Sequence, residues 1–222
     1  MILAAGKGAR MLPLTRHIPK PLVPVRGKPF INHIIDAFPK SIGEIIVVIG
    51  YKGDLIRHHL KKRYPKRSFI YVEQKKPLGT ADALLKTKHL FKNRKERFFI
   101  VYGDAFTTPE EISRTLAHPY SWVCHSFTQS IPTGVVKIDK KGRILRVAEK
   151  RSGTKPPFVS AGSVMLVDGT IFEYKPWRHS KGEYYLTSML GQFLKHNDVY
   201  AVLGLPDVSL STAEDVAKFN AL

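Results

Sequence analysis

Two apolar runs that each end in a glycine limit the folds open to this chain of 222 residues. Ile45-Ile-Val-Val-Ile-Gly50 and Phe98-Phe-Ile-Val-Tyr-Gly103 consist mainly of β-branched and aromatic residues and contain no charge. Continuous apolar runs of this kind are typical of strands buried on both faces, as in a parallel sheet covered by helices. Met1-Ile-Leu3 predicts a third such strand, so we expect a fold of the α/β class.

Helical patterns lie between these runs, at 30–38, 55–64 and 80–90, with Thr80 as the expected N-cap of the third helix. Strands that alternate with helices predict a mainly parallel sheet with helices on both faces. In such sheets ligands bind beyond the carboxyl ends of the strands. The segments that follow the runs at 1–3 and 98–102 are therefore the first places to look for a site.

After residue 120 the pattern changes to short strands, expected at 122–127, 134–139, 144–149 and 163–167. Asp139-Lys-Lys-Gly142 is typical of a hairpin turn. Helices are expected at 184–196 and 212–222, the last with Ser211 or Thr212 as its N-cap. Because the sequence contains no linker and no repeat, we expect one domain, 1–222, made of the halves 1–120 and 121–222.

The formal net charge of +18 is unusually high, and basic residues concentrate at 52–67, 86–97 and 137–155. Three interpretations stay open: a solvated basic face, a field that attracts anionic substrates, and a nucleic-acid surface. In Leu55-Ile-Arg-His-His-Leu-Lys-Lys-Arg63 the basic residues alternate with apolar ones, which is typical of the polar face of an amphipathic helix. The sequence has no RNA-binding aromatic motif, so nucleic acid is the least favoured partner.

The single cysteine, Cys124, excludes an internal disulfide and fits a reducing compartment. It lies in a strand-like run, where we expect a small buried core residue rather than a reactive thiol. No apolar run reaches the roughly 18 residues that a membrane span needs, and the start lacks the basic segment of a secretion signal. We therefore expect a cytoplasmic protein with no membrane partner.

A small-residue loop follows the first strand and carries glycines at Gly6 and Gly8. Glycines let the backbone adopt positive φ and bring its N–H groups close to a ligand, and successive N–H groups form a concave anion site. Arg10 and Lys20, the latter between two prolines, add full positive charges. This combination predicts a polyphosphate site.

Together with Pro19-Lys-Pro-Leu-Val-Pro24, this segment resembles the N-terminal signature of the sugar-phosphate nucleotidylyltransferases almost residue for residue. The resemblance implies a Rossmann-like three-layer sandwich with a mixed, mainly parallel sheet, the nucleotide-diphospho-sugar transferase fold. It implies an enzyme that forms an NDP-sugar and pyrophosphate from an NTP and a sugar 1-phosphate. Residues 1–120 would form the nucleotide-binding half and 121–222 the sugar-phosphate-binding half. The implied nucleotide-binding residues of the loop are Leu3, Ala5, Gly6 and Gly8, and the implied catalytic residues are Arg10, Lys20 and Asp104.

The resemblance continues at 73–80, where Gln74, Gly79 and Thr80 match nucleotide-binding positions of the family. An amide side chain can pair with a base edge. Because users of UTP, dTTP and GTP share much of this pattern, the base stays open. Gly103-Asp104 matches the metal-binding aspartate of the family, and a carboxylate that faces a triphosphate suits Mg²⁺, the implied cofactor.

Three segments of the second half, 133–139, 147–150 and 159–162, resemble the sugar-phosphate side of the family. The implied sugar-phosphate-binding residues are Gly134, Glu149, Lys150 and Gly162. By position, the carboxylate of Glu149 would accept hydrogen bonds from sugar hydroxyls, and Lys150 would hold the phosphate.

Near the C-terminus the chain departs from the family pattern. Ser209 stands where the family has a second metal-binding aspartate, and Ser188 replaces another aspartate. On a strand Asp207 would face the same way as Ser209, which makes Asp207 the candidate second metal ligand. Two functions stay open: an active transferase, and a catalytically weak or inactive paralogue that binds nucleotide or sugar as a regulatory subunit. Either could form a homo-oligomer.

Overall fold

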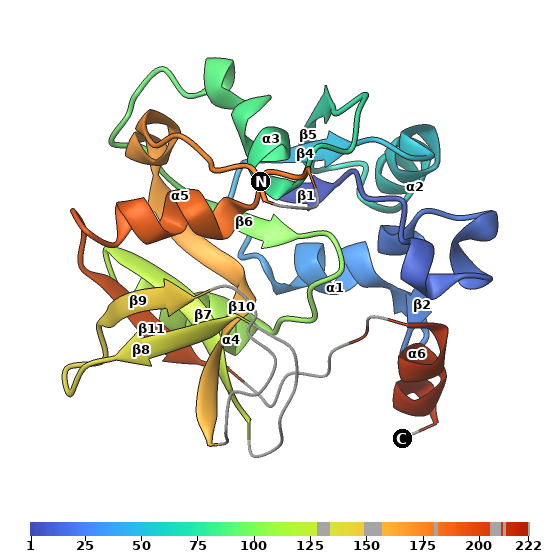
Figure 1. Ribbon diagram of the computed structural model, residues 1–222. Coiled ribbons are helices and arrows are strands. Elements are labelled where there is room, and N and C mark those ends of the chain that lie inside the picture. The colour runs from blue at the N-terminus through green and yellow to red at the C-terminus, as the bar shows by residue number, and fades with distance from the viewer. Residues whose placement is uncertain (128–133, 149–156, 180–181, 205–209, 211, 222) are drawn as a thin grey trace. The chain divides into compact units, whose positions relative to one another are not determined.

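The computed structural model describes residues 1–127, 134–148, 157–179, 182–204, 210 and 212–221 (Figure 1). The chain divides into two compact units. The first unit is Met1–Pro77, Val101–Pro109 and Val208–Leu222, and the second unit is Leu78–Ile100 and Glu110–Asp207. The expected single domain with halves that meet at residue 120 stays a prediction.

Parallel strands form the centre of the first unit. They are β1 (Ile2–Ala4), β4 (Glu44–Ile49), β5 (Ser68–Glu73) and the end of β6 (Arg97–Tyr102), in the order β6-β1-β4-β5. Ile2 of β1 lies in register with Val47 of β4 and Val101 of β6. The structure confirms the three strands expected from apolar runs, with the first shifted by one residue. The half-exposed edge strand β5 was not predicted, because its apolar run is short and lies between charged segments.

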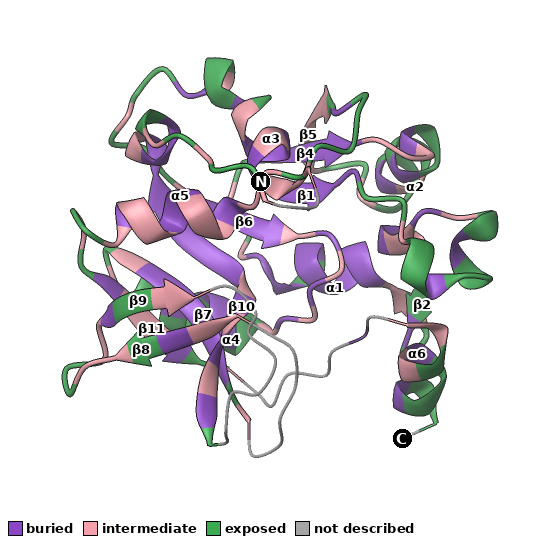
Figure 2. Ribbon diagram, in the orientation of Figure 1, coloured by how far each residue is buried: buried purple, intermediate pink, exposed green. Residues whose placement is uncertain are grey.

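The helices of the first unit differ in how far they are buried (Figure 2). Helix α1 (Phe30–Ala37) is buried along nearly its whole length. Helix α2 (Gly53–Arg63) buries only Gly53, Ile56 and Leu60 and exposes its basic residues, as expected for an amphipathic helix. Short elements complete the unit: the 3-10 turns η1 (Ala9–Met11), η2 (Leu14–Arg16) and η3 (Lys20–Leu22), and the β2 (Pro24–Val25) and β3 (Lys28–Pro29) hairpin.

A capping box starts helix α6 (Ala213–Asn220). The Asp215 N–H donates to Thr212 Oγ1 at 3.1 Å, and the Thr212 N–H donates to Asp215 Oδ2 at 2.8 Å. Thr212 is therefore the N-cap, one of the two residues expected. Val216 and Phe219 of α6 pack in one buried cluster with Met11, Val25 and Phe30.

Antiparallel pairing dominates the second unit, as expected for the sequence after residue 120. Its strands are β7 (Tyr120–Phe127), β8 (Val135–Ile138), β9 (Ile144–Ala148), β10 (Phe158–Asp168) and β11 (Val199–Leu203). Strand β10 pairs antiparallel with β7 and β8, whereas the unpredicted β11 pairs parallel with β7. The strand expected at 163–167 is the second part of β10, whose first part contains the small residues Ser160, Ala161 and Gly162.

The expected hairpin turn joins β8 to β9. Asp139 Oδ1 accepts hydrogen bonds from the N–H groups of Lys141 at 2.8 Å and Arg143 at 2.9 Å. Gly142 adopts φ +82°, a conformation that favours glycine. The hydrogen bonds, led by that from the Arg143 N–H, hold the pKa of Asp139 below its usual value.

Helices α3 (Thr80–Leu85), α4 (Pro109–Leu116) and α5 (Leu186–Phe193), with the 3-10 turns η4 (Lys88–Leu90) and η5 (Gly169–Glu173), accompany these strands. The predicted N-cap role of Thr80 is wrong. Gly79 is the N-cap, and Thr80 Oγ1 accepts a hydrogen bond from the Leu186 N–H at 3.0 Å. The predicted helix 80–90 is divided at Thr87, whose hydroxyl donates to the Leu84 carbonyl at 2.7 Å. Helix α4 was not predicted. Among the described residues, no helix has the length and apolar character that a membrane crossing requires.

Cys124 lies on β7 with no exposed surface, as predicted for a core residue. Burial raises the pKa of its thiol to about 12, because the thiolate would lose its hydration. At pH 8 we therefore expect no reaction of the native protein with a disulfide reagent and full labelling of one thiol in denaturing urea. Rapid labelling of the native protein would contradict this placement.

Removing the cap of α6 is expected to destabilise the first unit. Thr212→Ala leaves the Asp215 N–H without its side-chain partner and costs about 1 kcal/mol in the free energy of unfolding. Thr212→Ser keeps the hydroxyl and serves as the matched control. Urea unfolding followed by circular dichroism measures both, and equal losses for Ala and Ser would contradict the capping role.

Candidate functional site

Close approach of the backbone defines the carboxyl end of β1. Gly50 follows β4 and Gly103 follows β6, one on each side of the end of β1. A Cβ on Gly50 would lie 2.7 Å from the Ala5 carbonyl oxygen, and one on Gly103 would lie 3.0 Å from Ala4 Cα. The Gly103 N–H donates to the Leu3 carbonyl at 2.9 Å. Glycine is required at both positions, and this packing fixes the point from which the glycine loop starts.

The two loop glycines have different reasons to be glycine. Gly8 adopts φ +64°, and a Cβ there would lie 3.0 Å from both Thr15 Cγ2 and Lys20 Cβ. Its carbonyl accepts hydrogen bonds from the Met11 N–H at 2.9 Å and from Thr15 Oγ1 at 2.8 Å. A Cβ on Gly6 would meet no atom within 4 Å. Gly8 therefore sets the shape of the loop, while Gly6 leaves space beside it.

Lys20 joins the loop to the end of β6. Its side chain leaves the backbone beside Gly8, and its ammonium bonds to Asp104 Oδ2 in the turn after Gly103. The Lys20 side chain is 14% exposed and that of Asp104 is 35% exposed. Arg10 is exposed and forms no ion pair within the described chain. The structure thus brings together three predicted residues, Gly8, Lys20 and Asp104, and leaves the charge of Arg10 available to a ligand.

Asp104 suits a metal that arrives with phosphate ligands. The described residues contain no group of three or more His, Cys, Asp or Glu side chains that could hold a metal ion. Mg²⁺ is commonly held by one or two carboxylates together with substrate phosphates and waters. A single carboxylate beside a predicted polyphosphate loop fits this second mode. The predicted ligand Asp207 and the departure at Ser209 lie outside the described residues.

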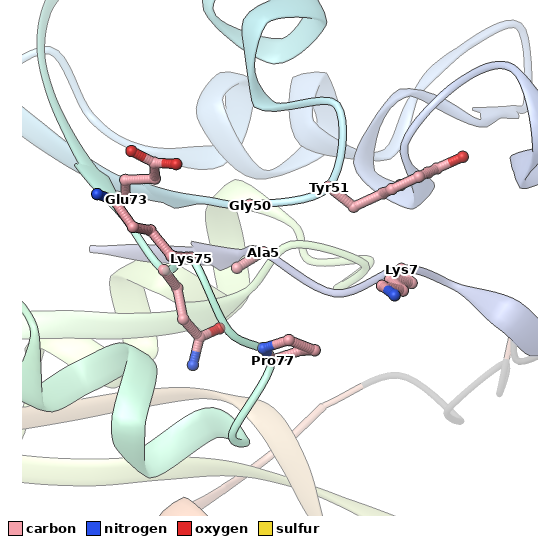
Figure 3. Close-up of a pocket in the computed structure, with 8 residues that line it drawn as sticks. Ala5, Lys7, Gly50, Tyr51, Glu73, Lys75 and Pro77 are labelled. Atoms are coloured by element: carbon pink, nitrogen blue, oxygen red, sulfur yellow. The ribbon is translucent and has the colours of Figure 1, made fainter.

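A cavity of about 180 Å³ opens beside the strand ends of the first unit. Figure 3 shows Ala5 next to Gly50, with Tyr51 and Lys7 on one side, Glu73 and Lys75 on the other, and Pro77 below Ala5. Its eight lining residues are Ala5, Lys7, Gly50, Tyr51, Glu73, Gln74, Lys75 and Pro77.

The structure therefore places the predicted residue Gln74 in one cavity with the predicted residue Ala5. Gln74 is only 6% exposed, and its N–H donates to the Ile49 carbonyl at 2.8 Å. Leu3, also predicted, is buried in β1. Sequence reasoning missed Lys7 and Tyr51. Their positions in the sequence could have identified both residues. Lys7 lies between the two loop glycines, and Tyr51 directly follows the glycine that ends a buried strand.

Gly79 and Thr80 of the second unit lie against the chain before α5. Gly79 adopts φ +103°, and a Cβ there would lie 2.4 Å from the Tyr184 carbonyl oxygen. The Tyr184 N–H donates to the Leu78 carbonyl at 2.8 Å, and the Ala81 N–H donates to the Tyr184 carbonyl at 2.9 Å. Close backbone packing alone thus requires glycine at position 79.

Gly134 and Gly162, which were predicted from the sequence to bind the sugar phosphate, come together around β10. The Ala161 N–H donates to the Gly134 carbonyl at 2.9 Å. The neighbouring Gly162 is buried, and a Cβ there would lie 2.4 Å from the Val123 carbonyl oxygen. Gly134 has room for a Cβ, whose nearest neighbour would be the Ala148 carbonyl oxygen at 3.5 Å. Glu149 and Lys150 lie outside the described residues.

Ser188, which replaces a family aspartate, has a local role in the first turn of α5. Its hydroxyl donates to the Tyr185 carbonyl at 2.7 Å and accepts from the Trp177 N–H at 3.1 Å. The hydroxyl is therefore bound to nearby backbone groups rather than held ready for a ligand.

Comparison with known proteins assigns the chain to a family. The profile of the family described as Nucleotidyl transferase matches residues 1–205. The bifunctional protein GlmU of Methanocaldococcus jannaschii is 30% identical over 204 residues, which are 91% of this chain and 48% of that protein. The protein of the same name from Methanococcus maripaludis is 27% identical over 206 residues, with the same two shares. The chain thus spans about half the length of the curated relatives that it matches.

Two solved structures share the fold. A UDP-glucose pyrophosphorylase in complex with UDP-glucose superimposes with a TM-score of 0.80 at 19% identity, over 99% of this chain and 96% of that one. A Bacillus anthracis protein described as a glucose-1-phosphate thymidylyltransferase gives 0.81 at 22% identity, over 99% and 92%. These likenesses confirm the predicted Rossmann-like α/β fold with its mixed, mainly parallel sheet.

Substitution of Gly79 tests the packing against Tyr184. Gly79→Ala places a methyl group on the Tyr184 backbone and forces alanine to positive φ, which together cost more than about 1 kcal/mol in unfolding free energy. Gly43→Ala is the control, because a Cβ at Gly43 meets no atom within 4 Å. Thermal unfolding measures both, and equal melting temperatures for the two variants would contradict the contact.

Proposed function

Because this chain belongs to the nucleotidyl transferase family, we propose that it joins the nucleotidyl group of an NTP to a sugar 1-phosphate and releases pyrophosphate. The observation that carries the proposal is the junction of Gly8, Lys20 and Asp104 at the carboxyl ends of β1 and β6. Asp104 lies 84 residues from Lys20 in the sequence. The three residues unite a glycine loop, a cation and a carboxylate. That combination supports the handling of a charged polyphosphate.

The proposed reaction is an in-line displacement at the α-phosphorus of the NTP. An oxygen of the sugar phosphate forms the new P–O bond, and the bond between the α-phosphorus and the bridging oxygen to the β-phosphorus breaks. Pyrophosphate leaves with the electron pair of that bond. Because the attacking oxygen is already anionic, no general base is needed, and catalysis depends on alignment and charge neutralisation.

The residues of the first unit divide these tasks. Backbone N–H groups of the loop at Gly6 and Gly8 bind the triphosphate, and the exposed guanidinium of Arg10 neutralises the leaving pyrophosphate. Lys20 exchanges part of its contact with Asp104 for a phosphate oxygen. Asp104 is the residue that would hold Mg²⁺. When bound, the metal would supply positive charge to the phosphate oxygens.

The cavity at Ala5 and Gln74 is the proposed place of the nucleobase. The Gln74 amide carries both donors and acceptors for a base edge, and UTP, dTTP and GTP are the candidate nucleotides. Gly79 and Thr80 are proposed to complete the nucleotide site. On the sugar-phosphate side we propose Gly134 and Gly162 together with Glu149 and Lys150. The cytoplasmic location and a homo-oligomer also stay predictions.

Asp104→Asn is expected to lower pyrophosphate release by roughly two orders of magnitude or more, because the neutral amide loses the charge pairing with Lys20 and offers no anionic metal ligand. Asp198→Asn provides the matched control. Asp198 is a 67% exposed partner of Arg143 in the second unit, and surface pairs contribute little.

The assay crosses four NTPs with several sugar 1-phosphates and measures pyrophosphate with Mg²⁺ present. Activity of Asp104→Asn equal to that of the control would overturn the assignment of Asp104. Tight nucleotide binding by the unaltered protein without pyrophosphate release from any pair would instead support a regulatory, nucleotide-binding protein.

A further inference from the structure

Lys52 is held in a backbone conformation that glycine, not lysine, favours. It adopts φ 51° and ψ 36° as the N-cap of α2, directly between Tyr51 and Gly53. A non-glycine residue in this left-handed region is uncommon and costs free energy. Its side chain offers the compensation, since Lys52 Nζ donates to the Arg16 carbonyl at 2.8 Å. Strain at this position therefore coincides with a contact to the segment that follows the glycine loop.

Tyr51 reaches the same segment. Its hydroxyl lies 3.3 Å from the Thr15 carbonyl and 3.2 Å from the Arg16 carbonyl, with one proton to donate between them. Lys52 Nζ lies 5.4 Å from the centre of the Tyr51 ring. Figure 3 shows the Tyr51 side chain leaving the chain beside Gly50 and running away from Ala5. Two consecutive residues at the end of β4 thus hold two consecutive carbonyls.

The held segment determines the shape of the loop. Thr15 is 1% exposed and donates from Oγ1 to the Gly8 carbonyl at 2.8 Å. Its Cγ2 would lie 3.0 Å from a Cβ on Gly8. A shift of Thr15 would therefore displace Gly8. It would change the left-handed conformation of Gly8 and weaken the hydrogen bond from the Met11 N–H to the Gly8 carbonyl. The contacts run without a gap from Tyr51 and Lys52 through Thr15 and Arg16 to Gly8.

We propose that Tyr51 and Lys52 are positioning residues for the phosphate-binding loop: they anchor the Thr15–Arg16 turn and through it fix the backbone of Gly8. The link to catalysis rests on the proposed function. The anchoring itself is a property of the chain without substrate.

Three variants and one charge control separate positioning from stability. Lys52→Asn removes the bond to Arg16, while asparagine tolerates positive φ better than lysine does, which offsets part of the lost stability. Lys52→Arg keeps a donor of similar reach and is the rescue variant. Tyr51→Phe keeps the ring that lines the cavity and removes only the hydroxyl. Lys61→Gln, on the exposed face of α2, controls for the loss of one positive charge.

Hydrogen exchange of the Met11 amide in the substrate-free full chain is the first measurement. We expect the double variant of Tyr51→Phe and Lys52→Asn to exchange about tenfold faster at Met11, the factor that one lost charged hydrogen bond represents. Only a small loss is expected in the melting temperature of the double variant, because asparagine relieves the strain at positive φ. The Lys61→Gln and Lys52→Arg variants are expected to match the unaltered protein in both Met11 exchange and melting temperature. Unchanged exchange at Met11, or faster exchange throughout with a lowered melting temperature, would overturn the anchor.

Kinetics of pyrophosphate release give the second measurement. In the double variant the looser loop is expected to raise KM for the NTP about tenfold with a smaller change in kcat. The Lys52→Arg variant is expected to keep the KM of the unaltered protein. A changed Met11 exchange in a protein that releases no pyrophosphate would keep the anchor and defeat the proposed function. Unchanged Met11 exchange in a double variant of an enzyme that releases pyrophosphate would defeat the anchor and keep the proposed function.

Discussion

The contact on which the rest of the site depends is the close approach of three strand ends. Ala4 and Ala5 leave β1 between Gly50 and Gly103, and neither glycine has space for a side chain. Parallel strands bring their carboxyl ends to one edge of a sheet, and here the edge is packed backbone against backbone. The glycine loop, the Lys20 and Asp104 pair and the cavity at Gln74 all begin from this edge.

Charge in the first unit has more than one role. The Lys20 ammonium is matched by Asp104, and Lys52 uses its charge on a backbone carbonyl. Arg57 lies 4.5 Å from the centre of the Tyr71 ring. The exposed residues Lys61, Lys62 and Arg63 of α2 agree with a solvated basic face. Part of the net charge of +18 therefore belongs to structural contacts and part to the surface.

Sequence patterns predicted the buried strands well, but they missed the partly buried strands and misassigned one helix cap. The runs before Gly50 and Gly103 are continuous and apolar, so their burial on both faces could be predicted from the sequence. Strands β5 and β11 are only partly buried, and their signal was lost among charged neighbours. Thr80 follows a glycine and has a capping side chain, yet its hydroxyl bonds to Leu186, because a partner 106 residues away outweighs the local preference.

By itself the sequence determined the fold class and predicted a polyphosphate site at the loop, since hydrophobic periodicity, glycines and fixed charges are local properties. It also identified Gly8, Lys20 and Asp104 through a family resemblance. Only the tertiary structure decided that these three residues adjoin, that Gly79 must be glycine because of Tyr184, and that Tyr51 and Lys52 hold the turn behind the loop. The physical reason is that each of these facts is a contact between segments distant in sequence, and such contacts leave no periodic pattern in the chain.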